Sequence, residues 1–250
     1  MNREELKKYI GVTGYSMGQV EKDYFQHVVL GGISRKMGAA LVFKGGTALQ
    51  KTGIVRRFSE DLDFTARADF SVDSLVGTAV NAIRNYNFQA EADEVRDGES
   101  TAGFRLKIHG LLYRNRRAIC TIRIEVSRRE CVVLEPERRE FAPPYADILP
   151  YVMDVMRDEE MMAEKVRAIY TRSKARDLYD MHKLAESGVS LNADIANEKL
   201  AYYGLRFDAR AFIEKCEKLR HDWESELLPL VENPAPYQTA LDSVKNAIRK

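Results

Sequence analysis

The 250-residue sequence is poor in cysteine and has no apolar run long enough to span a membrane. Cys120, Cys131 and Cys216 lie far apart and lack metal-site spacing, so we expect reduced thiols. No stretch approaches the roughly 20 apolar residues that a transmembrane helix needs. The charged start MNREELKKYIG does not resemble a signal peptide. These absences predict a cytoplasmic protein with no membrane partner.

A large net charge is also lacking, because 39 Lys and Arg nearly balance 38 Asp and Glu. The net charge of +1 gives no global reason to expect nucleic-acid binding, so such a site must be a local patch. Residues 101–139 carry the strongest local excess, with ten basic against four acidic residues. This excess indicates either a solvated hairpin tip or an RNA-binding patch made of Arg114, Arg116, Arg117, Arg128 and Arg129.

Hydrophobic residues make up 45% of the chain, which is ordinary for a globular protein with a sizeable core. Prolines at 143, 144 and 150 mark a change in composition. We therefore expect an α+β (mixed α/β) chain with a strand-rich domain over residues 1–149 and a helical domain over residues 150–250. Periodicity predicts strands near 41–44, 88–95, 101–113, 119–127 and 151–156, and helices near 17–38, 72–86, 158–172, 175–187, 191–203, 208–221 and 236–249.

Residues 41–64, LVFKGGTALQKTGIVRRFSEDLDF, carry the first candidate site. An apolar strand that ends in Gly45 and Gly46 and leads into a helix is typical of a phosphate-binding turn. Thr47 could cap that helix with its hydroxyl. Asp61 and Asp63 alternate along the next strand, so both carboxylates share one face. Two such carboxylates repel each other unless a cation lies between them, which predicts a magnesium site and phosphoryl or nucleotidyl transfer.

Glu125 lies among β-branched residues in the strand predicted over 119–127. A glutamate in an interior strand is costly to bury alone, so it needs a cation. That cation is either the metal of Asp61 and Asp63 or a neighbouring arginine, and both interpretations remain open.

Residues 159–184 hold a second cluster of charged residues. Lys165 and Arg172 are seven residues apart, so they nearly superimpose on a helix and could reach nucleotide phosphates with their long side chains. Asp177 and Asp180 share one face of the next predicted helix, and Arg176 is spaced to pair with Asp180. A helical hairpin held by salt bridges is the alternative interpretation.

Three segments, FKGGTALQK, RFSEDLDF and EKVRAIYTRSKARDLYD, resemble the AbiEii/AbiGii toxin family in the order of that family. The resemblance extends over about residues 20–225 and includes the MenT-type toxins of the polymerase-β-like nucleotidyltransferase superfamily. It implies a nucleotidyltransferase domain with a mixed sheet, followed by a helical domain that closes the nucleotide cleft.

The resemblance also implies roles for individual residues. Gly45 and Gly46 match the glycine motif, and Asp61 and Asp63 match the metal-binding aspartates. Ser59 matches a hydroxyl position just before these aspartates, and Lys165 matches the lysine expected at the triphosphate. Asp180 matches the later motif aspartate, and Arg176 and Asp177 match the Arg-Asp pair beside it. Glu125 matches a third carboxylate on a strand. Two positions depart from the common pattern, since Thr47 replaces serine and Glu125 replaces aspartate.

The implied activity is transfer of a nucleotide from an NTP, with release of pyrophosphate and with Mg²⁺ or Mn²⁺ as cofactor. The implied acceptor is RNA, in particular the tRNA 3′ end, so the implied outcome is a block of translation and growth. A cognate antitoxin is the implied protein partner. Two alternatives remain: transfer to a protein or small molecule, and a non-catalytic nucleotide-binding regulator on the same fold.

Overall fold

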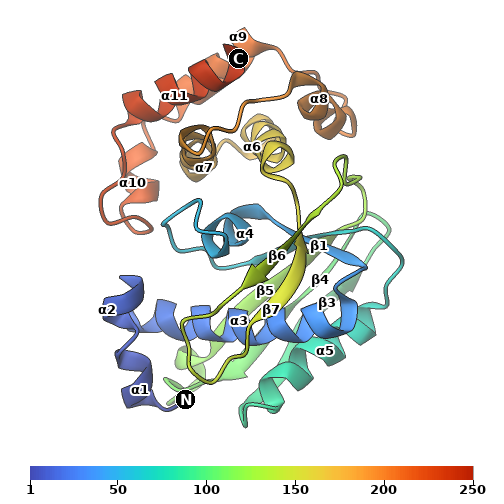
Figure 1. Cartoon of the computed structure of the whole chain (residues 1–250), viewed down its shortest axis with the longest axis vertical. Helices are drawn as coiled ribbons and strands as arrows, with labels where there is room; N and C mark the ends of the chain where they lie inside the picture. Colours follow the sequence, from blue (N-terminus) through green and yellow to red (C-terminus); the bar gives the residue numbers. More distant parts are fainter. Residues whose placement is uncertain (250) are drawn as a thin grey trace. The chain divides into compact units, whose positions relative to one another are not determined.

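The computed structural model describes residues 1–249, and the chain divides into two compact units (Figure 1). Unit 1 consists of Met1–Thr47, Glu60–Cys131 and Glu137–Val155. Unit 2 consists of Ala48–Ser59, Val132–Pro136 and Met156–Lys250. Unit 1 contains the sheet and unit 2 is helical, so the predicted α+β class is confirmed.

Unit 1 is built on a seven-stranded mixed sheet with the order β3-β4-β5-β2-β1-β7-β6. Strand β2 pairs antiparallel with β1 and parallel with β5, and β1 pairs parallel with β7. The strands are β1 (Leu41–Lys44), β2 (Leu62–Ala66), β3 (Gln89–Asp97), β4 (Thr101–His109), β5 (Cys120–Ser127), β6 (Glu137–Phe141) and β7 (Tyr151–Val155).

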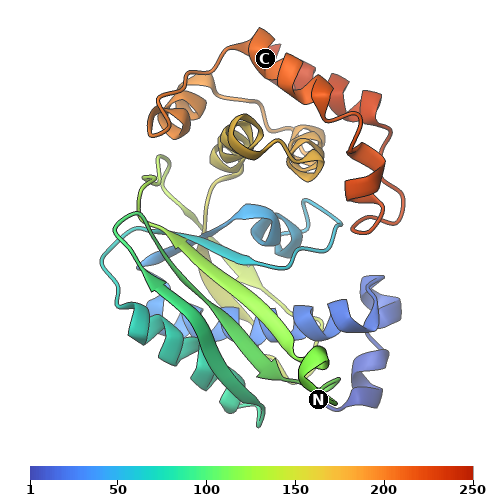
Figure 2. The same ribbon diagram turned by 180° about the vertical axis from the view of Figure 1, so that it is seen from behind.

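Helices cover one face of this sheet because apolar side chains alternate along its strands. Leu62, Phe64, Ile122 and Ile124 are buried, whereas their neighbours in sequence point to the opposite, more polar face. Figure 1 shows helices α3 and α5 in front of the sheet, and Figure 2 shows the strands from the other side. The helices of unit 1 include α1 (Arg3–Lys7), α2 (Ile10–Thr13), α3 (Met17–Met37) and α5 (Val72–Arg84), and a 3₁₀ turn, η1, spans Arg116–Ala118.

Unit 2 gathers the C-terminal helices around two segments that come from earlier in the chain. Glu160 holds the segment 132–136, because its carboxylate accepts hydrogen bonds from the N–H groups of Val133 and Leu134, both at 2.9 Å. Lys199 forms an ion pair with the same buried carboxylate at 2.5 Å. The helices of this unit are α6 (Asp158–Arg172), α7 (Ala175–Glu186), α8 (Ala193–Ala201), α9 (Ala209–Lys218), α10 (Trp223–Leu227) and α11 (Tyr237–Arg249).

Most elements predicted from periodicity are confirmed within a few residues, but some escaped prediction. Strand β6 lies in the stretch 136–150 that the prolines had marked as a crossing. Its sequence ERREF has no apolar alternation, because β6 is an edge strand with one hydrogen-bonded neighbour. Helix α4 (Gly45–Lys51) follows β1 directly, as the strand-to-helix prediction required. No helix within residues 1–249 is long and apolar enough to cross a membrane.

Helix α3 contains two adjacent glycines that have different surroundings. A Cβ atom at Gly32 would lie 2.7 Å from the Cβ of Ala82 in α5. A Cβ atom at Gly31 would meet the ordinary contacts of 3.5 Å to Arg35 and 3.6 Å to Tyr151. Gly32 therefore allows α3 and α5 to approach closely, whereas Gly31 has no such steric reason to be glycine.

We expect Gly32→Ala to destabilise unit 1 by about 1–3 kcal/mol through overpacking against Ala82. Gly31→Ala is the matched control, and it should stabilise the protein by roughly 0.5–1 kcal/mol because alanine favours the helix more than glycine. Urea unfolding of both variants measures the two changes. Equal effects of the two substitutions would contradict the close approach at Gly32.

Candidate functional site

The turn between β1 and α4 is shaped to fit the carboxylate of Asp63. Gly45 has a φ of +79°, in the left-handed region that favours glycine. A Cβ atom at this position would lie 2.7 Å from Oδ2 of Asp63. Gly46, the second glycine of the predicted motif, is buried in the first turn of α4. The side chain of Asp63 therefore occupies the space that a Cβ atom at position 45 would need, so only glycine fits there without displacing the carboxylate.

Thr47 links the same turn to the other aspartate. Its side chain is fully buried, and its hydroxyl donates a hydrogen bond to the backbone carbonyl of Asp61. The sequence interpretation of this hydroxyl as a helix cap is wrong, because α4 begins at Gly45 and Thr47 lies inside its first turn. The bond ties the glycine turn to the start of the strand that carries both aspartates.

Asp61 and Asp63 are both half-buried, on one face of β2 and the residue before it. Burial raises the pKa of the Asp61 carboxyl; Arg123 opposes this shift, and Glu60 and Glu125 add to it. A carboxylate with acidic neighbours in a partly buried place gains from a nearby cation. The oxygen donors and the excluded space at Gly45 fit Mg²⁺, which prefers one or two carboxylates together with substrate phosphates.

Glu125 is the register partner of Asp63 on β5, but its carboxylate has arginine partners. Arg96 lies 3.0 Å from it and Arg123 lies 3.7 Å from it. Among residues 1–249, no group of three or more His, Cys, Asp and Glu side chains is arranged to hold a metal ion. The alternative of an arginine-paired glutamate is therefore present in the structure, and the role of Glu125 as a metal ligand stays a prediction.

A buried ion pair next to the glycine turn was missed by the sequence reasoning. Lys44, the last residue of β1, lies in register with Asp63, and its Nζ is 3.1 Å from Oε2 of Glu130. Both side chains are at least nine-tenths buried. The signal in the sequence was a lysine at the end of the apolar run LVFK, but its partner Glu130 lies 86 residues further along the chain, in the segment that follows β5.

The second cluster lies within unit 2, where two fully buried aspartates bind three cationic side chains. Lys165 on α6 contacts Asp177 at 3.0 Å and Asp180 at 2.6 Å. Arg172 donates two hydrogen bonds to Asp177, at 2.9 and 2.8 Å. Arg57 donates two hydrogen bonds to Asp180, at 2.6 and 2.7 Å.

The electrostatics of this cluster favour the charged form of both aspartates. Burial by itself would raise the pKa of Asp177 and Asp180, but the adjacent cations outweigh it and hold each pKa below its ordinary value. Lys165 and Arg172 are the main opposing groups for Asp177, and Arg57 and Lys165 are those for Asp180. Three cations face two carboxylates, so the cluster carries an excess positive charge.

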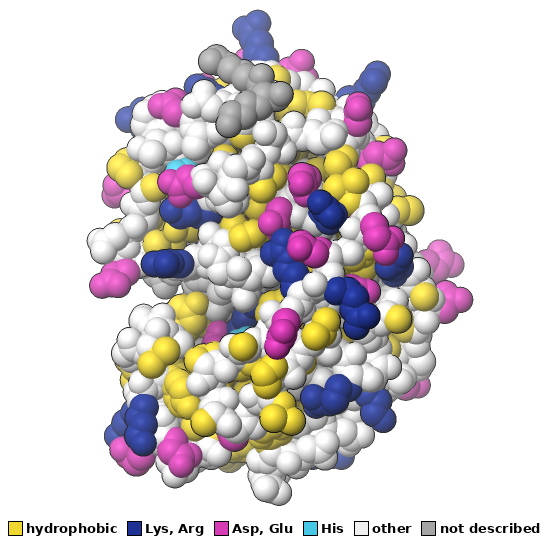
Figure 3. Space-filling view, in the orientation of Figure 1, with side chains coloured by type: hydrophobic (Ala, Val, Ile, Leu, Met, Phe, Trp, Pro, Cys, Tyr) yellow, Lys and Arg dark blue, Asp and Glu magenta, His cyan; other side chains and the backbone are white. Residues whose placement is uncertain are grey.

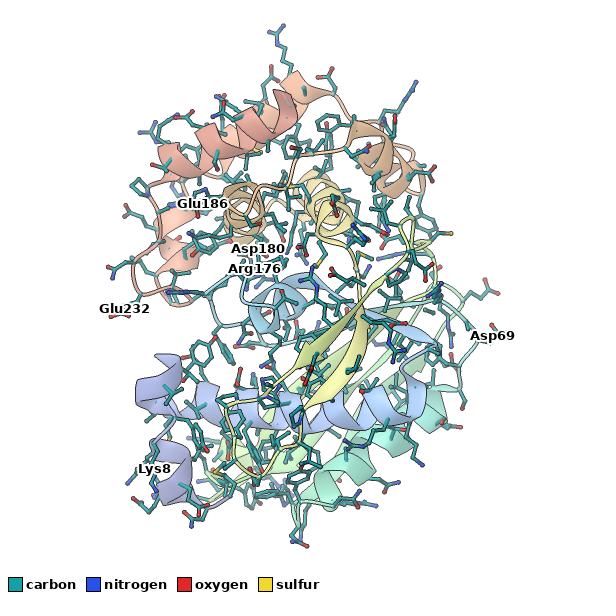
Figure 4. All side chains as sticks on the ribbon, in the orientation of Figure 1. Lys8, Asp69, Arg176, Asp180, Glu186 and Glu232 are labelled. Atoms are coloured by element: carbon teal, nitrogen blue, oxygen red, sulfur yellow. The ribbon has the colours of Figure 1, made fainter. Side chains whose placement is uncertain are left out.

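The predicted pair between Arg176 and Asp180 is wrong. Figure 4 labels both residues on α7; Arg176 is exposed, and Asp180 is fully buried against Arg57 and Lys165. Arg57 is 123 residues away from Asp180 in the chain, so helical spacing could not reveal it. The salt-bridged alternative for α6 and α7 is thus present, and the nucleotide-binding roles of Lys165, Arg172 and Arg176 stay predictions.

The remaining predicted residues lie in several places. The N–H of Ser59 donates a hydrogen bond to the side chain of Gln50 at 3.2 Å. The five candidate RNA-binding arginines form two separate groups at opposite ends of β5, which is about 23 Å long. Arg128 and Arg129 follow the strand, where Asp97 and Glu130 pair with them, and the group from 114 to 117 precedes it.

Comparison with known protein families decides which class of protein carries these clusters. The model of the "Nucleotidyl transferase AbiEii toxin, Type IV TA system" family matches residues 33–245, a range that contains both clusters. The chain belongs to the AbiEii family of nucleotidyltransferase toxins. The predicted family and the predicted enzyme class are confirmed by this match. The comparison with curated protein sequences found no match.

Several solved structures resemble the chain in fold over most of its length. MenT4, a nucleotidyltransferase toxin from Mycobacterium tuberculosis, is 20% identical, with a TM-score of 0.64, and the match covers 99% of this chain and 88% of MenT4. A predicted nucleotidyltransferase from Helicobacter pylori is 21% identical, with a TM-score of 0.64 and 93% and 94% coverage. JHP933 from Helicobacter pylori is 19% identical, with a TM-score of 0.58 and 93% and 90% coverage.

We expect Gly45→Ala to reduce both stability and activity, because the new methyl group would displace the Asp63 carboxylate. Gly53→Ala is the matched control, since Gly53 has a φ of +81° and its Cβ would meet nothing within 4 Å. Both variants should lose about 1–2 kcal/mol of stability from left-handed strain. Activity should fall in Gly45→Ala alone, and an equal loss of activity in both would contradict the steric role of Gly45.

Arg57→Met should destabilise the protein by about 3–5 kcal/mol, because it leaves the buried Asp180 with Lys165 as its remaining cation. Arg56 is the adjacent exposed arginine, so Arg56→Met should change stability by less than about 0.5 kcal/mol. Thermal and denaturant unfolding measure both variants. A small effect of Arg57→Met would show that Asp180 does not depend on this guanidinium.

Proposed function

We propose that the protein transfers a nucleotide from an NTP to an RNA acceptor, the tRNA 3′ end, and so blocks translation and growth. The supporting observation is that the carboxylates of Asp61 and Asp63 share one face at the start of β2, with Asp63 against the turn at Gly45, in a member of a nucleotidyltransferase toxin family. The family description as a toxin–antitoxin system supports a cognate antitoxin as the protein partner and action in the cytoplasm.

In this proposal Asp61 and Asp63 would hold Mg²⁺. When bound, the metal would neutralise negative charge at the nucleotide phosphates. The backbone at Gly45 and the Thr47 hydroxyl bond keep the two aspartates in position, so the site needs little reorganisation when the nucleotide binds. An acceptor hydroxyl oxygen attacks the α-phosphorus, and the bond between the α-phosphorus and the oxygen that bridges to the β-phosphorus breaks. Pyrophosphate leaves with the electron pair of that bond, and the hydroxyl proton passes to solvent water.

Lys165 and Arg172 act on the triphosphate in this proposal. The excess positive charge of their cluster favours an anion, and the Arg172 side chain is 48% exposed, so its guanidinium is accessible to a ligand. Charge develops on the pyrophosphate oxygens as they leave, and a fixed cation there lowers the barrier.

Asp180 orients Lys165 rather than deprotonating the acceptor. Both of its oxygens accept hydrogen bonds from Arg57, and Lys165 shares one of them. Its pKa lies below the ordinary range because Arg57 and Lys165 outweigh burial, so the carboxylate is a weak base. A fully buried carboxylate with occupied oxygens is suited to fixing the lysine.

The test is incubation of the protein with each labelled NTP, Mg²⁺ and total tRNA. We expect label on RNA, and we expect Asp61→Ala and Lys165→Ala each to reduce transfer by 100-fold or more (roughly the loss when a main catalytic group is removed). Loss of transfer on adding EDTA checks the metal. Label that survives RNase would point to a protein or small-molecule acceptor, and nucleotide binding without turnover would point to a regulator. Full activity in either variant would remove the site assignment.

A further inference from the structure

Three arginines before β5 differ from the other basic residues of 101–139 in having no acidic partner. Within residues 1–249, the side chains of Arg114, Arg116 and Arg117 are exposed and form no ion pair. The other basic residues of this range each lie within 4 Å of a carboxylate: Arg105, Lys107, Arg123, Arg128, Arg129, Arg138 and Arg139. Figure 3 likewise shows basic and acidic side chains interspersed on the face seen there. The three arginines therefore keep an uncompensated positive charge.

The loop that presents these arginines is fixed to the body of unit 1. Glu21 of α3 is buried, and its carboxylate accepts a hydrogen bond from the N–H of Leu112 at 2.6 Å. A Cβ atom at Gly110 would lie 2.5 Å from the same carboxylate, so the loop packs directly against α3. The side chain of Asn115 then accepts a hydrogen bond from the N–H of Arg117 and begins η1. The arginines are thus presented by an ordered turn and not by a loose tip.

Aromatic rings lie next to these arginines. His109 and Tyr113 are stacked with their ring centres 4.1 Å apart and their planes 3° apart, and Tyr113 is 37% exposed. A cavity of about 490 Å³ opens at His109, and Arg84, Phe88 and Lys107 also line it. An exposed tyrosine ring beside unpaired arginines is the combination that binds bases and phosphates of single-stranded nucleic acid.

We propose that residues 109–117, which we name the arginine turn, form a docking surface for the phosphate backbone of RNA. This inference rests on the proposed function for identifying that RNA as the acceptor. Glu125, the register partner of Asp63, is five residues from the start of β5, so the arginine turn lies on the order of 20 Å from Asp63. The turn therefore holds the acceptor at a point remote from the reaction centre. Figure 2 shows the turn at the lower end of β5.

An RNA fits this surface better than an acidic protein does. An acidic protein would satisfy the three charges but would leave the stacked rings and the cavity without a role. RNA provides phosphates for the arginines and bases for Tyr113 and the cavity at His109. The nearly neutral charge of the whole chain does not oppose this, because phosphate contacts act within about 10 Å at ordinary salt.

The experiment measures binding of labelled tRNA, without NTP, by the full chain at several salt concentrations. The test variant is Arg114→Gln/Arg116→Gln/Arg117→Gln, and the control is Arg3→Gln/Arg56→Gln/Arg206→Gln, which removes three exposed arginines elsewhere. We expect the test variant to bind tRNA roughly ten- to a hundred-fold more weakly, with a salt slope lower by about 2. The control should match the wild type, and NTP binding should be the same in all three. Tyr113→Ala should weaken tRNA binding without changing the slope.

Equal tRNA affinity of the test and control variants would overturn the proposal and would leave the turn to an acidic protein partner. The absence of tRNA binding by the wild type would overturn it as well. These outcomes are separate from the proposed transfer reaction. Transfer to RNA with an unchanged KM for tRNA in the test variant would sink the docking surface and leave the transfer intact. If the nucleotide is transferred to a protein while the tRNA affinity depends on the arginine turn, the docking surface stands and the proposed RNA acceptor is wrong.

Discussion

The burial of two carboxylates on one helix sets the structure of unit 2. Asp177 and Asp180 are completely buried, and an unpaired charge in such a place is strongly destabilising. Lys165 from α6, Arg172 at the end of α6, and Arg57 from the segment 48–59 supply the compensating charge. Because α6, α7 and the segment 48–59 each contribute charged side chains, the cluster fixes these three parts of the chain to one another. Removing Arg57 takes away two of the hydrogen bonds that Asp180 accepts and leaves Lys165 as the remaining cation beside that buried carboxylate.

The same logic applies in unit 1 on a smaller scale. The Asp63 carboxylate lies against the backbone of Gly45, and the Asp61 carbonyl receives the Thr47 hydroxyl. The turn at Gly45 and Thr47 therefore holds the two aspartates in place, and it has no room for a side chain at position 45. A site that is held before its ligand arrives loses less free energy to reorganisation when it acts.

Charge pairing also explains why a count of basic residues was a poor guide to a binding surface. On the polar face of the sheet, Arg105 and Lys107 face Glu94 and Asp93, and Arg96 faces Glu125. Their fields cancel at short range, so they contribute little to steering a polyanion. The arginine turn differs because, within residues 1–249, its three arginines have no acidic partner. Glu21 holds the backbone of this loop instead of neutralising its arginines.

The sequence by itself determined most of the elements and the protein family. Apolar alternation and helical spacing depend on local geometry, so they gave the strands and helices, and the motifs with Asp61, Asp63 and Lys165 gave the family. Tertiary structure alone decided the partners. Arg57 on Asp180, Glu130 on Lys44 and Arg96 on Glu125 join residues that are far apart in the chain or on different strands. Such contacts form only when the chain closes on itself, because a buried charge selects whichever opposite charge the fold brings near, and no local spacing encodes that choice.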